Sequence, residues 1–135
     1  MYTPDWTGGV VVGDVLVAQS QSTAATFTSS AAVSLINLTG KMLLIFDVSA
    51  ITNNTFELQI FGVTTNAVSG GTQVGNALGA STQTGTMTAV VGAQVFQIDL
   101  ETFTPGPYMY ASLTVGGSTH TAVFSLQYVA LKKLV

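Results

Sequence analysis

The chain has 135 residues, of which three are Lys or Arg and six are Asp or Glu, so only 7% are charged. An ordinary soluble domain is about 25% charged. With a net charge of −3 and no arginine, the chain is not suited to neutralising a phosphate backbone, and no nucleic-acid partner is expected. The absence of cysteine excludes a disulfide framework and a thiolate metal site.

The low charge also predicts association. Near-neutral surfaces promote contact between copies, and the mean hydropathy of +0.53 is high for a free monomer. A monomer covered with Thr, Ser, Asn and Gln is the alternative. We expect instead that copies of the chain, or a partner, cover much of the surface.

Neither a leader nor a membrane span is expected. The first residues lack a basic segment followed by an apolar one. The most apolar run, Met42–Phe46, is far too short to cross a bilayer. We therefore expect a protein that is made in the cytoplasm, has no membrane partner, and either stays there or leaves within an assembly.

Short strands are predicted along the first third of the chain. Residues 10–19 alternate loosely in polarity, and residues 20–30 are a Ser/Thr/Ala connector. The next strand, over residues 32–38, would place Val33 and Leu35 on one face.

A longer strand is predicted after a turn at Thr39-Gly40. It covers residues 41–51 and includes the run Met42–Phe46, which has no polar interruption. Such a run is typical of a strand covered on both faces, either at the centre of a sandwich or under a subunit contact. Asn53-Asn54 then predicts another turn.

The middle of the chain contains the clearest alternation and the longest loop. Residues 55–63 place Phe56, Leu58 and Ile60 on one face, as in a half-buried strand. Residues 64–85 are rich in Gly, Thr, Asn and Ser and predict a loop with at most one weak strand around Thr72–Val74.

Four more strands complete the prediction. They are expected over residues 86–91, 95–100, 108–115 and 120–131. Phe96, Ile98 and Leu100 would share one face of the second of these strands. Gly116-Gly117-Ser118 predicts a tight turn that joins the last two strands as a hairpin.

These elements predict an all-β fold, an antiparallel β-sandwich of seven or eight strands that is jelly-roll-like. A closed barrel is the lesser alternative. No internal repeat or domain boundary is evident, so residues 1–135 are expected to form a single domain, with residues 1–9 as an extended N-terminal arm.

Catalytic and metal-binding patterns are not found. His120 has neighbouring Ser and Thr residues, but a triad needs an orienting carboxylate and an activated serine, and no G-x-S-x-G motif is present. The acidic residues form neither a calcium loop nor a convincing glycosidase pair, although an ion shared between subunits stays open. The glycines match no phosphate-binding motif. We therefore predict no enzyme, no catalytic residue, no cofactor and no metal.

Aromatic residues are the candidate partner-binding residues. Tyr2, Pro4 and Trp6 would form a docking arm, extended by its proline and aromatic at both ends, although they could equally cap their own domain. Tyr108 and Tyr110 are the other candidates, as anchors of the core or of an interface.

Two segments resemble small virion proteins of tailed bacteriophages. One is the strand-turn-strand segment over residues 46–60. The other is the closing pair over residues 108–126, with its Gly116-Gly117-Ser118-Thr119 turn. The resemblance implies a capsid decoration (cement) protein, located in the virion, that binds the capsid protein shell and copies of itself. It implies a homo-oligomer, with a trimer favoured, and carries over no catalytic residue.

Two other classes stay open. A self-assembling jelly-roll coat or tail-tube subunit would form shells or tubes from the pure protein, where a decoration protein would form only small oligomers. A carbohydrate-binding module or adhesin would bind glycans through Tyr108, Tyr110 or Trp6.

Overall fold

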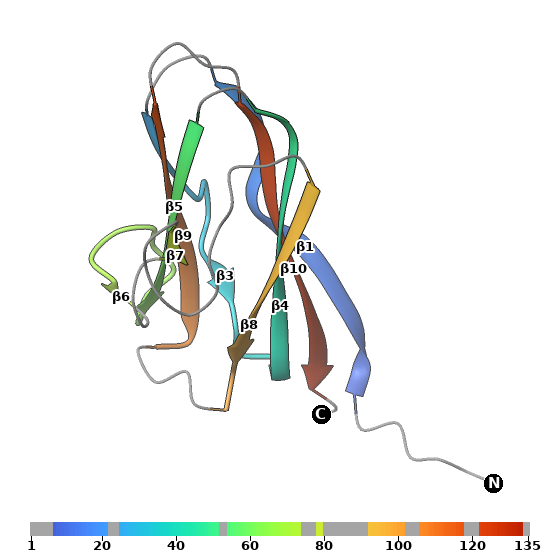
Figure 1. Cartoon of the computed structure of the whole chain (residues 1–135). Coiled ribbons are helices and arrows are strands. Elements are labelled where there is room, and N and C mark those ends of the chain that lie inside the picture. The colour runs from blue at the N-terminus through green and yellow to red at the C-terminus, as the bar shows by residue number, and fades with distance from the viewer. Residues whose placement is uncertain are drawn as a thin grey trace, which may run out of the picture.

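The computed structural model describes residues 7–21, 25–51, 54–73, 78–79, 92–101, 106–117 and 122–133. Within these residues the chain forms two antiparallel sheets that face each other across one core (Figure 1). Sheet A has the strand order β1-β10-β4-β8. Its strands are β1 (Thr7–Gln21), β10 (Ala122–Lys133), β4 (Leu38–Ile51) and β8 (Gly92–Asp99).

Sheet B has the strand order β2-β9-β5-β6, while β3 also pairs with β9 and β7 also pairs with β5. Its strands are β2 (Ala25–Thr28), β3 (Val33–Ser34), β9 (Tyr108–Gly117), β5 (Asn54–Val63), β6 (Thr72–Gln73) and β7 (Leu78–Gly79). Because β2 and β3 border the same strand, and β6 and β7 do likewise, each pair acts as one interrupted edge strand.

The connectivity is that of a jelly roll. Counted in this way, eight strands form four antiparallel pairs from the ends of the chain inward: β1 with β10, β2/β3 with β9, β4 with β8, and β5 with β6/β7. Wrapping this series of pairs around a core brings β10 beside β4 and β9 beside β5. Two four-stranded sheets result, which is the double-sheet arrangement of jelly rolls. The predicted fold class is therefore confirmed.

The predicted closing hairpin is wrong. β9 lies in sheet B and β10 lies in sheet A, so the segment between them crosses from one sheet to the other. The strand-turn-strand segment over residues 46–60 crosses in the same way, because β4 and β5 also belong to different sheets. In both cases each strand turns an apolar face inward, and the two faces meet across the core rather than side by side.

Three smaller predictions are also corrected. The predicted connector over residues 20–30 contains β2, and the predicted strand over residues 32–38 is reduced to the two-residue β3. Thr39-Gly40 is not a turn, because β4 is continuous from Leu38. Gly40, with a φ of +75°, instead lies where the pairing of β4 with β10 shifts in register, a place where a left-handed glycine produces a bulge.

Other predicted strands are confirmed. β5 turns Phe56, Leu58 and Ile60 into the core, as the alternation predicted. β6 falls within the weak strand predicted near Thr72, but β7 is a second short strand in a stretch where at most one was predicted. β8 lies within one to three residues of its predicted range. The predicted strand over residues 86–91 lies outside the described residues.

The core is built from the inward faces of both sheets and includes an aromatic cluster. Phe27, Phe46, Phe56 and Phe124 come from four different strands, two in each sheet. The ring centroids of Phe46 and Phe56 lie 5.1 Å apart, and those of Phe27 and Phe124 lie 5.3 Å apart, both edge-on. Such pairs add about 0.5–1.5 kcal/mol beyond their burial, so the cluster joins sheet A to sheet B.

Ser29 bridges the interruption between β2 and β3. It is 2% exposed, and its backbone N–H donates to the Ala111 carbonyl at 2.9 Å. The Ala111 N–H in turn donates to the Ser29 hydroxyl at 2.9 Å. The side chain thus accepts the hydrogen bond that a backbone carbonyl would accept in an unbroken strand, and it satisfies a buried donor of β9.

Candidate interaction surfaces

The outward face of sheet A carries a group of aliphatic side chains among polar ones, which include Gln97 of β8 and the hydrogen-bonded pair Gln127 and Asp14. Val10 and Val12 of β1 are 64% and 62% exposed, and Val95 of β8 is 57% exposed. Cross-strand partners share a face of a sheet, and the register places further aliphatic side chains beside these three. They are Leu131 and Val129 of β10 and Leu43 and Ile45 of β4. These seven aliphatic residues are called the sheet A patch below.

Charged side chains stand at both ends of the patch along β4. The outward residues of this strand are, in order, Lys41, Leu43, Ile45 and Asp47, and both charged residues are exposed. Asp99 lies beside Lys41 in the register, whereas Asp47 lies between Ser125 and Ala93, neither of which is charged. The outward row of β4 is therefore positive at one end, aliphatic in the middle and negative at the other end.

The outward face of sheet B is polar in the rows that run through β2. Its register rows join Thr26 to Thr114 and Glu57, and Thr28 to Ser112 and Gln59. The hydroxyls of Thr26 and Thr114 are hydrogen-bonded to each other at 3.2 Å, and the Gln59 amide donates to Gln73 Oε1 at 3.5 Å. The polar groups in these rows can form hydrogen bonds with water. The exposed aliphatic residues are therefore particular to sheet A and do not simply follow from the overall composition.

Tyr110, one of the two predicted anchors on β9, packs against residues of its own chain. It is 6% exposed, and its ring stacks on Phe61, with the centroids 4.9 Å apart and the planes at 12°. Its hydroxyl accepts a hydrogen bond from the Gly71 N–H at 3.3 Å. Tyr110 thus fixes the segment before β6 onto sheet B. Tyr108, at the start of β9, is half-buried beside Val63.

The other predicted partner-binding residues, Tyr2, Pro4 and Trp6, lie outside the described residues, as does His120. β1 begins at Thr7, so the last three residues of the predicted arm, 7–9, belong to sheet A. The arm as a docking segment stays a prediction.

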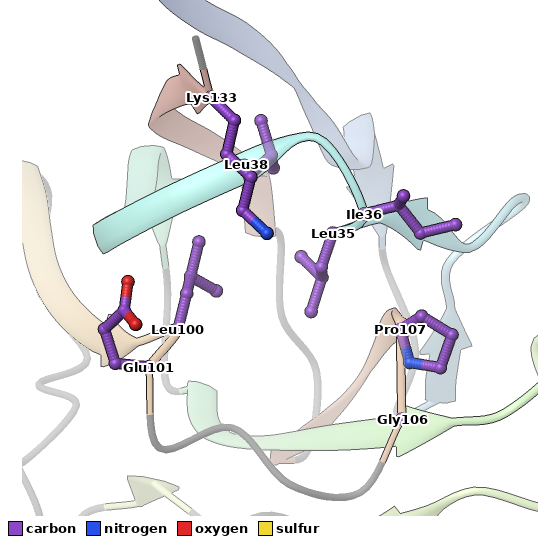
Figure 2. Close-up of a pocket in the computed structure, with 8 residues that line it drawn as sticks. All are labelled: Leu35, Ile36, Leu38, Leu100, Glu101, Gly106, Pro107 and Lys133. Carbon is purple, nitrogen blue, oxygen red and sulfur yellow. The ribbon is translucent and has the colours of Figure 1, made fainter. Parts of the chain in front are cut away.

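A pocket of about 230 Å³ opens at one end of the sandwich. It is lined by residues from the connection between β3 and β4, by the residues directly after β8 and directly before β9, and by the end of β10. Figure 2 shows Leu35 and Leu100 directed into this space, with the Lys133 side chain extending toward it and Glu101 at its edge. Its lining therefore combines aliphatic side chains with one ammonium and one carboxylate.

Within the part of the chain that the structure describes, no group of three or more His, Cys, Asp or Glu side chains is placed to hold a metal ion. The same residues contain no helix that is long and apolar enough to cross a membrane.

Neither a protein-family model nor a curated protein matches the sequence. The fold, however, is similar to that of a viral capsid protein. VP2 of infectious bursal disease virus, in a subviral particle, superposes with a TM-score of 0.50 at 13% identity, over 93% of this chain and 32% of that chain. The likeness shows a common jelly-roll fold.

Two further structures of infectious bursal disease virus match more weakly. The T13 viral particle gives a TM-score of 0.46 at 16% identity, over 92% of this chain and 31% of that chain. The Gt strain gives 0.47 at 13%, over 99% of this chain and 40% of that chain. The chain spans 31% to 40% of the length of these viral chains.

The sequence partly indicated the sheet A patch. The uninterrupted run Met42–Phe46 predicted a strand covered on both faces, and the structure places Met42, Leu44 and Phe46 in the core and the two residues between them in the patch. The sequence does not mark Val10 and Val12 as outward-facing residues, because Val11 between them is also valine and no alternation in polarity is visible.

Proposed function

We propose that the chain is a structural virion protein, a capsid decoration protein that stabilises a viral shell by bridging capsid subunits. In this role it binds the assembled shell in preference to free subunits and so shifts the equilibrium toward assembly by mass action. It needs a rigid domain with one adhesive face and no reaction chemistry.

The observation that carries this proposal is the division of the two outward faces. One jelly-roll sheet presents seven aliphatic side chains among polar ones, and the other presents hydroxyls and amides in the rows that join β2, β9 and β5. Apolar patches on small soluble domains mark interaction sites. The similarity in fold to a capsid protein supports a shell as the setting, and the resemblance to tailed-phage virion proteins supports decoration.

A self-assembling coat subunit is the second candidate. The likeness to VP2 within a subviral particle favours it, since that protein is itself found in a particle. The carbohydrate-binding alternative receives less support, because Tyr110 stacks within the domain and offers no free ring face for a sugar.

Electron microscopy of the purified protein, with and without capsids that lack it, separates these candidates. A decoration protein forms small oligomers alone, binds the capsids at regular positions, and raises the temperature at which they release their contents. Closed shells or tubes from the pure protein would move the assignment to the coat subunit. Small oligomers that leave the capsids bare and no more stable would overturn the decoration role.

A further inference from the structure

We propose that β8 pairs edge to edge with β8 of a second copy, antiparallel, about a twofold axis that is perpendicular to sheet A and crosses the pair at Phe96. The two four-stranded A sheets then form one continuous sheet. This inference goes beyond the proposed function, because it stands on the backbone of one edge strand and not on the sheet A patch. The trimer expected from the resemblance plays no part in it.

β8 is the most regular edge strand of the two sheets. Sheet A is bordered by β8 on one side and by β1 on the other (Figure 1). The pairing of β1 with β10 shifts in register at three points, and both edges of sheet B are interrupted, between β2 and β3 and between β6 and β7. Irregular and very short edge strands resist pairing with another chain. β8 instead pairs with β4 over eight residues without a shift, and it contains neither Pro nor Lys.

Alternate backbone groups of β8 point away from β4. The Leu100 N–H donates to the Gly40 carbonyl at 2.9 Å, in step with the register of the two strands. Hydrogen-bonded and non-hydrogen-bonded positions alternate along an antiparallel pair, so the even-numbered residues of β8 bond to β4. The N–H and C=O groups of the odd-numbered residues, Val95 and Gln97 among them, point to the other side. Within the described residues no strand borders β8 there.

The side chains of β8 suit a second copy of the same strand. In the proposed register Phe96 lies opposite Phe96 of the second copy, at a position without backbone hydrogen bonds, where cross-strand side chains are closest. Phe96 packs against the core but is only half-buried in one copy, so the pairing covers its exposed part. Val95 lies opposite Gln97 of the second copy. Each such pair exchanges two N–H···O bonds, and symmetry forms the pair twice.

Charge does not oppose this register. The one charged residue of β8 is Asp99, which would lie opposite Ala93 of the second copy. The nearest carboxylate of the second copy on this sheet is then Asp47, which flanks Ala93 on β4. It lies two strands from Asp99, about 10 Å, whereas screening at physiological salt acts over about 8 Å. Lys41, beside Asp99 in its own chain, offsets this repulsion further.

Removing one outward N–H tests the contact. Proline at position 97 has no N–H to donate to Val95 of the second copy, and the pairing of β8 with β4 keeps its hydrogen bonds, since this group points away from β4. By sedimentation equilibrium we expect Q97P to dimerise at least about tenfold more weakly than the wild type. Q97A keeps the N–H and is the matched control, with a dissociation constant within about threefold of the wild type. Thermal unfolding of both variants would confirm that they are folded.

Cysteine cross-linking tests the register in chains that keep every N–H. The wild type contains no cysteine, so each single variant has one thiol. Cα atoms opposed at a hydrogen-bonded position lie about 5.5 Å apart, a separation that a disulfide spans. Under mild oxidation we expect a 1:1 mixture of V95C and Q97C to form the linked heterodimer, and each variant alone to link far more slowly. T114C, exposed on the outward face of sheet B, is the control and should stay unlinked.

The two experiments fail in recognisable ways. A wild type that is monomeric throughout, a Q97P variant that associates as tightly as Q97A, or a mixture that stays unlinked would each overturn the proposal. V95C or Q97C linking alone as fast as the mixture would also overturn it, because that result requires a register shifted by two residues. Any of these results leaves the decoration role to be decided by its own capsid-binding experiment.

Discussion

Replacing Ser29 with alanine tests whether a side chain repairs the interrupted edge of sheet B. The substitution removes the hydroxyl that accepts the Ala111 N–H at 2.9 Å. Ala111 is fully buried, so its N–H loses its partner where water does not replace it. Leaving a buried donor unsatisfied costs about 1–3 kcal/mol.

The expected change in melting temperature follows from the size of the chain. The entropy of unfolding is about 2.1 cal/mol/K per residue, or about 0.28 kcal/mol/K for 135 residues. A cost of about 2 kcal/mol in the unfolding free energy, the middle of that range, therefore lowers Tm by about 7 °C.

Thermal and urea unfolding of S29A would check this value at one protein concentration, because association makes Tm depend on concentration. S30A is the matched control, since Ser30 is the next residue and is exposed. It should change the unfolding free energy by less than about 0.5 kcal/mol. If S29A were as stable as S30A, the hydroxyl would not carry the bridge between β2 and β3.

Three further predictions concern the core and the segment over sheet B. F124A should lower the unfolding free energy by about 3–5 kcal/mol, measured by urea unfolding, because Phe124 contacts Phe27, Phe46 and Phe56; a loss under 1 kcal/mol would contradict the aromatic cluster. G71A should lower the free energy of unfolding, measured in the same way, by about 1–3 kcal/mol. A Cβ at this position would lie 2.8 Å from the Gly62 carbonyl oxygen and 3.0 Å from the Tyr110 ring. G70N is its control, because Gly70 has a φ of +71° and open space around it, and asparagine tolerates that conformation; equal effects of the two would refute the close approach. Y110F should lower the free energy of unfolding by about 0.5–1.5 kcal/mol, because the hydrogen bond from the Gly71 N–H is lost. Hydrogen exchange of the Gly71 amide should accelerate, and an unchanged exchange rate would count against this bond.

The sequence predicted the strands better than the way in which they pair. The alternation of Phe56, Leu58 and Ile60 identified β5 because a half-buried strand has a period of two. The turn after Gly116-Gly117 could not show whether the chain returns beside β9 or crosses to the other sheet, since a short connection serves both. The crossing is established by the strand pairing, which places β9 beside β5 and β10 beside β4. Phe124 then packs against Phe56 across the core.

The sequence also did not reveal where the strands are irregular or interrupted. Gly40 has the residue type of a turn, but its left-handed conformation serves a shift in register within β4. Ser29 had the appearance of one more polar residue in a connector, and only the tertiary fold places its hydroxyl beside Ala111. The charge pattern of Lys41 and Asp47 is visible in the sequence, but it gains meaning once β4 is known to turn both residues outward.

The most direct test of an assembly role is the solution mass of the wild-type protein by light scattering, across protein concentration and ionic strength. We predict a discrete small oligomer that forms as the concentration rises and persists in high salt, because aliphatic contacts are not screened. A monomer at every concentration and ionic strength would contradict the account.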